Sequence, residues 1–147
     1  CDLWKDQRPP IQKGCAEVPA EGTEVALFAI GSMVETAWQV RKKLAEKGIP
    51  TTVVNARFAM PLDKNCLRKL AESHPLFVTM EENVASGGFG EHVAAFLEEE
   101  ALHTKVLRIA IPDCFVEHGS VGELKKALGL DADSVTEKIL AELPEEL

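Results

Sequence analysis

Short apolar runs alternate along this chain with longer segments in which apolar residues recur at every third or fourth position. The clearest run covers 25–30 without a polar residue and is closed by Gly31, which is typical of a central strand buried on both faces. A second run, 51–54, is β-branched throughout, and a later one is ended by Pro112. The pattern predicts strands at 25–30, 51–54, 76–80 and 106–111.

Helices are predicted between and after these strands from their caps and from an apolar period of about 3.6 residues. Ser32 and Glu35 have the S-x-x-E spacing of a capping box, and Gly48 is placed to end the helix that this box begins. Ser120 and Glu123 have the same spacing and predict a second box. The predicted helices cover 32–48, 63–73, 89–100, 120–128 and 131–143.

The helix after the second strand carries two start signals. Asp63 is placed to cap it, and Leu62 can contact Leu67 inside it, forming a hydrophobic staple that fixes the angle of entry. Pro75 then forces the chain out of helical geometry before the third strand begins.

Strands that alternate with helices of this length predict parallel strands joined by right-handed crossovers. The predicted fold class is therefore α/β, a doubly wound sheet covered by helices on both faces in three layers, α/β/α. The carboxyl ends of the strands form one rim of such a sheet, and ligands or other domains meet the loops there.

Size and charge narrow the range of partners. A chain of 147 residues is the size of one domain and needs no disulfide scaffold. Its net charge of -8 repels phosphate backbones, and no apolar run approaches the roughly 20 residues that cross a bilayer. We therefore expect no nucleic acid and no membrane partner, and a cytoplasmic location.

The four cysteines lack zinc-type spacing, and Cys66 is expected to pack as a small apolar residue.

The first ten residues have neither a strand period nor a helix period. Trp4 stands among charged residues, and two prolines close the stretch. We interpret 1–10 as a linker remnant from a preceding domain and 11–147 as the folded domain. A loosely attached tail is the alternative interpretation.

A glycine turn, Gly87-Gly88-Phe89-Gly90, leads from the third strand toward a helix. Helix amino ends attract anions, but this spacing matches neither G-x-G-x-x-G nor a P-loop. Glu81 and Glu82 would also oppose a bound phosphate because their charge is close in sequence. We expect a tight turn or a domain contact here.

Glu81 and Glu82 could serve as paired carboxylates in acid and base chemistry. Adjacent residues of an extended chain point to opposite faces, however, so only one of them can face a given cleft. We favour an arrangement in which one carboxylate accepts hydrogen bonds from backbone amides of the glycine turn while the other is in solvent.

The segment after the fourth strand contains Asp113, Cys114 and His118. A histidine beside a carboxylate can act as a general base, but no G-x-S-x-G pattern accompanies His118, which favours a capping or interface role. A catalytic thiolate at Cys114 would need an electropositive setting, and the neighbouring residues are acidic. Arg57 and Phe58 follow a strand, where the guanidinium is suited to pairing with a carboxylate on a neighbouring domain.

Three phrases together resemble a known family. They are Val53-Val54-Asn55-Ala56-Arg57-Phe58 through Pro61-Leu62-Asp63, Val78-Thr79-Met80-Glu81-Glu82 through Gly90, and Pro112-Asp113-Cys114-Phe115-Val116-Glu117-His118-Gly119-Ser120 through Asp131. From about Ile11 to about Leu140 the chain resembles the carboxyl-terminal domain of the 1-deoxy-D-xylulose-5-phosphate synthase family, within the transketolase-like thiamine diphosphate enzymes. It departs from the family's usual Asp at Asn55 and usual Arg at Cys114.

The resemblance implies a five-stranded mixed sheet, with a short antiparallel strand near Cys15 to Val18. It also implies a larger enzyme that joins pyruvate, with loss of CO2, to glyceraldehyde 3-phosphate for isoprenoid and thiamine biosynthesis. The family's thiamine diphosphate, Mg2+ and catalytic residues belong to preceding domains, so the implied role here is assembly, as part of a homodimer. No catalytic, cofactor-binding or metal residue is expected in this chain.

Two alternatives remain open. The chain could be the matching domain of a transketolase or of a 2-oxoacid dehydrogenase E1 β subunit. It could also be a free-standing flavodoxin-like binding module, with its ligand between the loops at Gly31 and Glu82. The residues predicted to lie at the domain or dimer interface are Arg57, Phe58, Glu81, Glu82, Gly87, Gly88, Phe89, Gly90, Asp113, Phe115 and His118.

Overall fold

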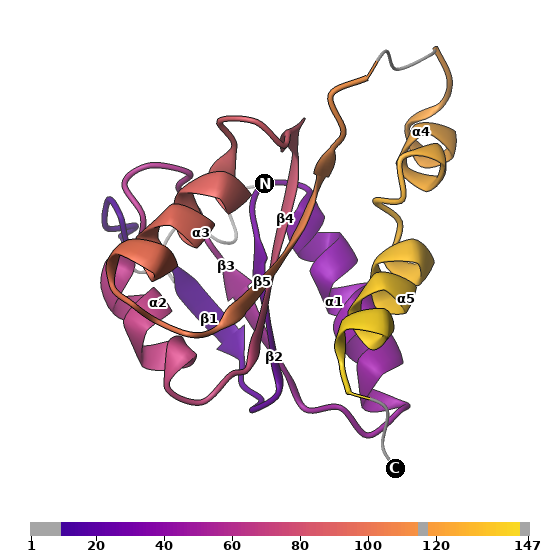
Figure 1. The fold of residues 1–147 in the computed structure, drawn as a ribbon. Helices are drawn as coiled ribbons and strands as arrows, with labels where there is room; N and C mark the ends of the chain where they lie inside the picture. Colours follow the sequence, from indigo (N-terminus) through magenta and orange to yellow (C-terminus); the bar gives the residue numbers. More distant parts are fainter. Residues whose placement is uncertain (1–9, 115–117, 145–147) are drawn as a thin grey trace.

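The computed structural model describes residues 10–114 and 118–144 of the chain. Figure 1 shows a single sheet with helices on both sides. The strands are β1 (Glu17–Ala20), β2 (Val25–Ala29), β3 (Thr51–Asn55), β4 (Leu76–Val84) and β5 (Lys105–Ile111). The helices are α1 (Met33–Ala45), α2 (Lys64–Ala71), α3 (Phe89–Glu99), α4 (Val121–Ala127) and α5 (Ala132–Glu142).

The five strands lie in the order β1-β3-β2-β4-β5, and only the β1–β3 pair is antiparallel. This confirms the predicted mixed sheet and its antiparallel edge strand, although β1 begins two residues later than the expected start at Cys15. The chain reverses its direction of winding at β2, because β3 pairs with one side of β2 and β4 with the other. The switch point is therefore at the carboxyl end of β2.

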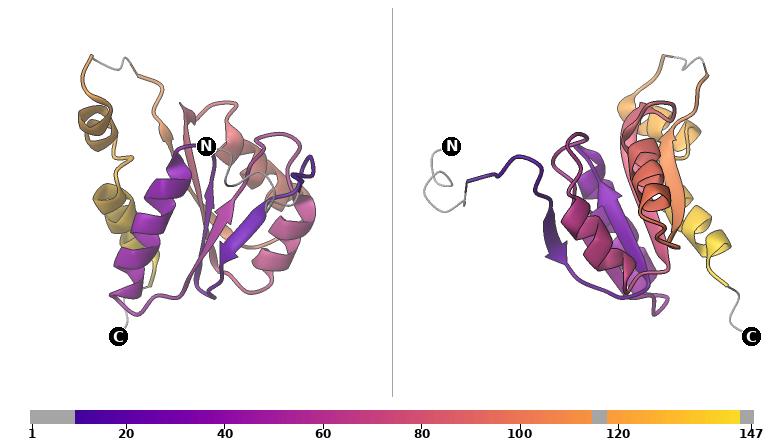
Figure 2. Two further views of the ribbon diagram at one scale, coloured as in Figure 1. Left: turned by 180° about the vertical axis from the view of Figure 1, so that it is seen from behind. Right: turned by 60° about the vertical axis from the view of Figure 1, so that its left-hand side comes forward.

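Alternation along β2 divides the core into two halves. Val25 and Leu27 pack with residues of α1 and α5, whereas Ala26 and Phe28 pack with residues of α2 and α3. Figures 1 and 2 show the same layers, with α1 and α5 on one side of the sheet and α2 and α3 on the other. All five residues of β2 are buried, as the uninterrupted apolar run predicts.

Three of the four predicted side-chain caps are confirmed, and the one at Ser32 is wrong although α1 begins there as predicted. Asp63 accepts the Cys66 N–H, Asp131 accepts the Ser134 N–H, and Ser120 forms a complete capping box with Glu123. Ser32 forms no side-chain cap, because its backbone is already helical and its hydroxyl is engaged elsewhere.

The element boundaries differ from the expectations mainly at β4. This strand continues to Val84, four residues beyond its predicted end, so Glu81 and Glu82 belong to the strand and not to a loop. The proposed linker, 1–10, lies outside the described residues except for Pro10. None of the described helices is long and apolar enough to cross a membrane.

Candidate functional site

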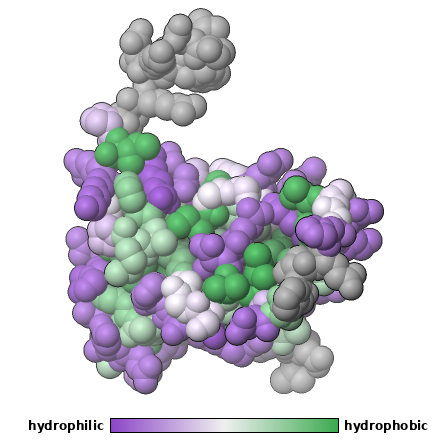
Figure 3. Space-filling model, turned by 90° about the horizontal axis from the view of Figure 1, so that it is seen from above, coloured by the Kyte–Doolittle hydropathy of each residue, from purple (hydrophilic) through white to green (hydrophobic). Residues whose placement is uncertain are grey.

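The carboxyl rim of the sheet gathers the loops that carry most of the predicted site residues. It is formed by the residues that follow β2, β3, β4 and β5, and it lies at the top of the view in Figure 1. Figure 3 looks down on this end of the molecule, where separate hydrophobic patches lie among hydrophilic side chains. Met60, Val84 and Val121 are exposed here by 60%, 49% and 71% respectively.

Glu81 lies inside the rim, with its carboxylate against the amino end of α3. Its Oε1 accepts the Phe89 N–H at 2.9 Å, and its Oε2 accepts the Gly90 N–H at 2.6 Å. The residue is only 1% exposed. A buried carboxylate that takes two amides at a helix amino end is stabilised by both hydrogen bonds and by the helix dipole. The protein therefore supplies its own anion where a phosphate would otherwise bind.

Close neighbours require glycine at two positions of this turn, Gly88 and Gly90. A Cβ on Gly88 would lie 2.3 Å from Glu81 Oε1, and a Cβ on Gly90 would lie 2.4 Å from Thr79 Oγ1. Both distances are too short for any side chain, so the glycines allow α3 to begin directly above β4. The structure thus contains the turn expected at this position.

Glu82 points to the opposite face of β4 and is exposed. Its Oε2 accepts the Ser32 hydroxyl at 2.5 Å, and its Oε1 lies 2.8 Å from Lys125 Nζ. The hydrogen bonds from Lys125 and, next, Ser32 lower the pKa of Glu82, against a weaker opposite effect of burial. Side chains from three elements thereby meet across the switch point.

Arg57 follows β3 and is paired within the chain. Its Nη2 lies 3.0 Å from Glu17 Oε2 on β1, and its backbone has a positive φ of 60°. The Arg57 N–H donates to Asn55 Oδ1 at 3.2 Å, which supports this unusual backbone. The family's usual aspartate at position 55 could accept the same hydrogen bond. The change to Asn55 therefore keeps this contact.

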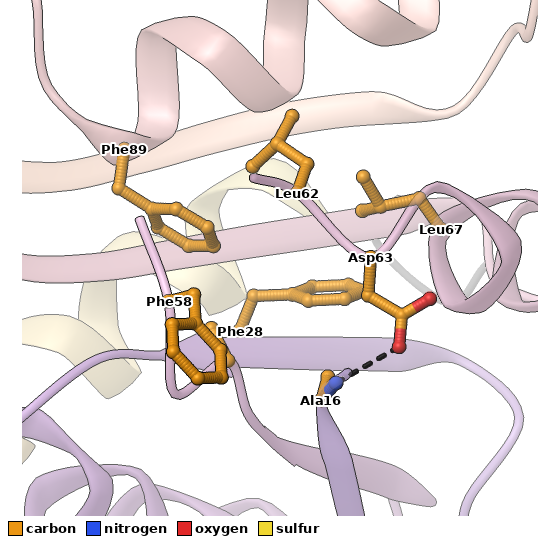
Figure 4. Close-up of a pocket in the computed structure, with 8 residues that line it drawn as sticks. Ala16, Phe28, Phe58, Leu62, Asp63, Leu67 and Phe89 are labelled. Carbon is orange, nitrogen blue, oxygen red and sulfur yellow. Dashed lines mark hydrogen bonds between the residues drawn. The ribbon is translucent and has the colours of Figure 1, made fainter. Parts of the chain in front are cut away.

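A small apolar cavity separates the β3–α2 loop from α3. It has a volume of about 10 Å3, room for no more than about one water molecule. Figure 4 shows the side chains of Phe28, Phe58, Leu62, Leu67 and Phe89 gathered around it, and the Ala16 N–H donating to Asp63 Oδ2 at 2.8 Å. The cavity is a packing gap, and Asp63 joins the incoming chain to the start of α2.

The predicted interface residues that the structure describes fall into three groups by exposure. Glu81, Gly88, Phe89 and Gly90 are buried within the domain and shape the rim. Glu82, Gly87, Asp113 and His118 are exposed, while Arg57 and Phe58 are partly buried. Phe115 lies outside the described residues.

Two contacts at the rim were not predicted from the sequence. Lys125 lies on α4, far along the chain from Glu82, and only the fold brings them together. Asp63 was recognised as a cap, but its second oxygen also accepts the Ala16 N–H. The free oxygen of a capping carboxylate could have signalled a second partner, though not which one.

The described residues offer little to a thiamine diphosphate or a metal ion. Among them, no group of three or more His, Cys, Asp or Glu side chains could hold a metal. The α3 amides that could bind a diphosphate are taken by Glu81. Cys66 lies partly buried against the α2–α3 half of the core, and burial raises the pKa of its thiol to about 11, so it is a poor nucleophile.

Comparison with known proteins agrees with the fold. Residues 14–135 match the sequence model of the family described as "Transketolase, C-terminal domain". The chain belongs to this family. A solved structure titled "Split gene transketolase, inactive beta4 tetramer" is similar over 89% of this chain and 42% of that one, with a TM-score of 0.81 and 30% identity.

Within this family, the chain is similar to curated 1-deoxy-D-xylulose-5-phosphate synthases. The 1-deoxy-D-xylulose-5-phosphate synthase of Lachnoclostridium phytofermentans is 53% identical over 136 residues, which cover 92% of this chain and 22% of the relative. The 1-deoxy-D-xylulose-5-phosphate synthase 1 of Geobacter metallireducens is 45% identical over 131 residues, covering 88% and 21%. The chain thus spans about a fifth of the length of these relatives.

Proposed function

We propose that this chain is the carboxyl-terminal domain of a 1-deoxy-D-xylulose-5-phosphate synthase. The observation that carries the proposal is the 53% identity to such a synthase across 92% of the chain. The whole enzyme would join pyruvate, after loss of CO2, to glyceraldehyde 3-phosphate in the cytoplasm. Its thiamine diphosphate and Mg2+ would be held by the remaining four fifths of the polypeptide.

The role proposed for this domain is assembly. Glu81 already satisfies the amides at the start of α3, which supports a rim without an anionic ligand. The exposed Met60 and Val84 give that rim apolar contact area. The partners proposed are the preceding domains of the same polypeptide and, through them, a second copy in a homodimer.

A domain exchange tests the proposal. In the Lachnoclostridium phytofermentans synthase, the matching 22% of the chain is replaced by this sequence, and synthase activity and sedimentation are measured. We expect the chimera to assemble and to form product, while the isolated 147-residue chain forms none. A soluble chimera that neither assembles nor turns over would contradict the proposal. The same exchange into a transketolase distinguishes the transketolase alternative, since we expect that chimera to fail.

Rim variants of the chimera locate the interface. Met60→Asp or Val84→Asp should weaken assembly, because either places a charge in apolar contact area. Trp38→Ser is the matched control, because Trp38 is an exposed apolar residue on the outer side of α1. Phe89 is unsuitable for this test, since at 3% exposure its replacement would perturb folding itself.

The free-standing binding module is the competing proposal from another class. Its ligand would occupy the switch point, where Glu82 already contacts both Ser32 and Lys125. Titration of the chain with small anions and nucleotides, monitored at the amides of Gly31 and Glu82, should show no saturable binding. Micromolar binding there would favour the module.

A further inference from the structure

Helix α4 is attached to the domain differently from the other helices. None of its residues is buried, whereas α1, α2, α3 and α5 each bury at least two. Figure 1 shows α4 beyond the end of α5, to one side of the sheet. Leu128, directly after α4, is the nearest residue that packs against the core between α1 and α5. Apolar burial therefore contributes little to holding α4 in place.

Glu82 supplies the polar attachment. Its two carboxylate oxygens are divided between Lys125 of α4 at 2.8 Å and Ser32 at the start of α1 at 2.5 Å. Lys125 is the less exposed partner, with 23% of its side chain accessible against 41% for Glu82. The carboxylate thus joins α4 to the end of β4 and to the first turn of α1.

The amino end of α4 is stabilised by its own residues. The Ser120 hydroxyl oxygen accepts the Glu123 N–H at 3.3 Å, and Glu123 Oε2 accepts the Ser120 N–H at 3.1 Å. Neither bond involves the body of the domain. The helix can therefore keep its cap when its contact with Glu82 is lost.

We infer that α4 is a separately opening unit that is fastened to the carboxyl rim by a clasp of Ser32, Glu82 and Lys125. Regions with few buried apolar contacts open locally at a lower free energy than the whole domain unfolds. Opening of α4 breaks the contact between Lys125 and Glu82, while Ser32 stays beside Glu82.

Hydrogen exchange on the 147-residue chain tests the clasp, with exchange followed by mass spectrometry in peptides that cover α4, α1 and α5. Lys125→Met and Glu82→Gln should each raise the exchange rate of α4 at least about threefold, the effect of losing one exposed ion pair. Exchange in α1 and α5 should stay at the wild-type rate. Lys126→Met is the matched control, because Lys126 is a neighbouring, exposed lysine of the same helix.

Three outcomes would overturn the inference. Unchanged exchange of α4 in Lys125→Met would show that the pair does not hold the helix. An equal rise in α1 and α5 would show that α4 opens only with the whole domain. A rise in Lys126→Met as large as in Lys125→Met would assign the effect to helix charge, independent of Glu82. The test depends on this chain alone and stands whether or not the synthase proposal holds.

Discussion

Glu81 and Glu82 are adjacent carboxylates with opposite surroundings. Glu81 faces α3, is 1% exposed and accepts two backbone N–H groups. Glu82 faces α4, is exposed and contacts two side chains. Successive residues of a strand point to opposite faces. Glu81 therefore lies buried against α3, whereas Glu82, the next residue of β4, forms the clasp at the surface. One glutamate thus fixes the start of α3, while the other holds α4 by exposed contacts that can open.

The largest expected difference between the two residues is in stability. Glu81→Ala leaves two buried amides without an acceptor, and we expect it to lower the free energy of unfolding by about 2 to 5 kcal/mol. Glu82→Ala should change it by less than about 1 kcal/mol, because water replaces exposed contacts. Urea unfolding followed by circular dichroism measures both.

The Glu81→Gln variant provides the control for that experiment. Glutamine has the same shape but one acceptor oxygen, so its NH2 group would face one of the two amides. We expect a loss of stability between wild type and Glu81→Ala. Equal stability of Glu81→Ala and Glu82→Ala would contradict the distinction between a buried anion and a surface clasp.

Two glycines in the first turns of helices extend the comparison. A Cβ on Gly90 of α3 would meet Thr79 Oγ1 at 2.4 Å, whereas a Cβ on Gly122 of α4 would meet nothing within 4 Å. Gly90→Ala should destabilise by about 1 to 3 kcal/mol through overpacking. Gly122→Ala should slow exchange in α4 by stabilising that helix by about 0.5 to 1 kcal/mol. A tolerated Gly90→Ala, seen as an unchanged urea midpoint, would argue against the close contact.

The fold could be predicted from sequence because its signals are local. The apolar run of β2, the prolines and the caps at Asp63 and Asp131 each act within a few residues, and the structure agrees with them. The edge strand β1 carries no such signal, since its residues are mostly exposed, and it was expected only from the family resemblance. Its pairing partner β3 lies more than 30 residues away.

The rim was predicted less completely, because its contacts join distant parts of the chain. That one glutamate of the pair would bind the glycine turn follows from strand alternation, and Glu81 confirms it. The pairing of Glu82 with Lys125 depends on where α4 packs, which no local pattern encodes. Ser32 is the opposite case. Its spacing with Glu35 predicts a capping box, but its hydroxyl donates to Glu82, which is distant in the sequence.

Acid should loosen the clasp by protonating Glu82. The pKa of folded Glu82 lies below its ordinary 4.5, so its contribution is fully present above pH 4.5 and is lost as the pH falls through the folded value. The groups shown to face it are the Ser32 hydroxyl and the Lys125 ammonium group. Protection of α4 against hydrogen exchange, corrected for the intrinsic rate, should therefore decrease as the pH falls below 4.5.

The Glu82→Gln variant isolates that pH effect. Glu123 of the capping box also has a pKa lowered by its hydrogen bonds to Ser120, and this titration persists in the variant. We expect Glu82→Gln to show a weaker pH dependence than wild type over the same range. Identical curves for the two proteins would assign the whole effect to the capping box.

Ser32→Ala should produce the smallest effect and decides between two roles for one hydroxyl. If Ser32 were the cap that its spacing with Glu35 suggests, alanine would cost about 1 kcal/mol and would raise exchange in the first turn of α1. Because the hydroxyl instead donates to Glu82 in an exposed position, we expect a change of less than about 0.5 kcal/mol. Asp131→Ala, which removes a cap that is present, should cost about 1 kcal/mol and calibrates the measurement. A Ser32→Ala loss as large as that of Asp131→Ala would return Ser32 to the capping role and remove one side of the clasp.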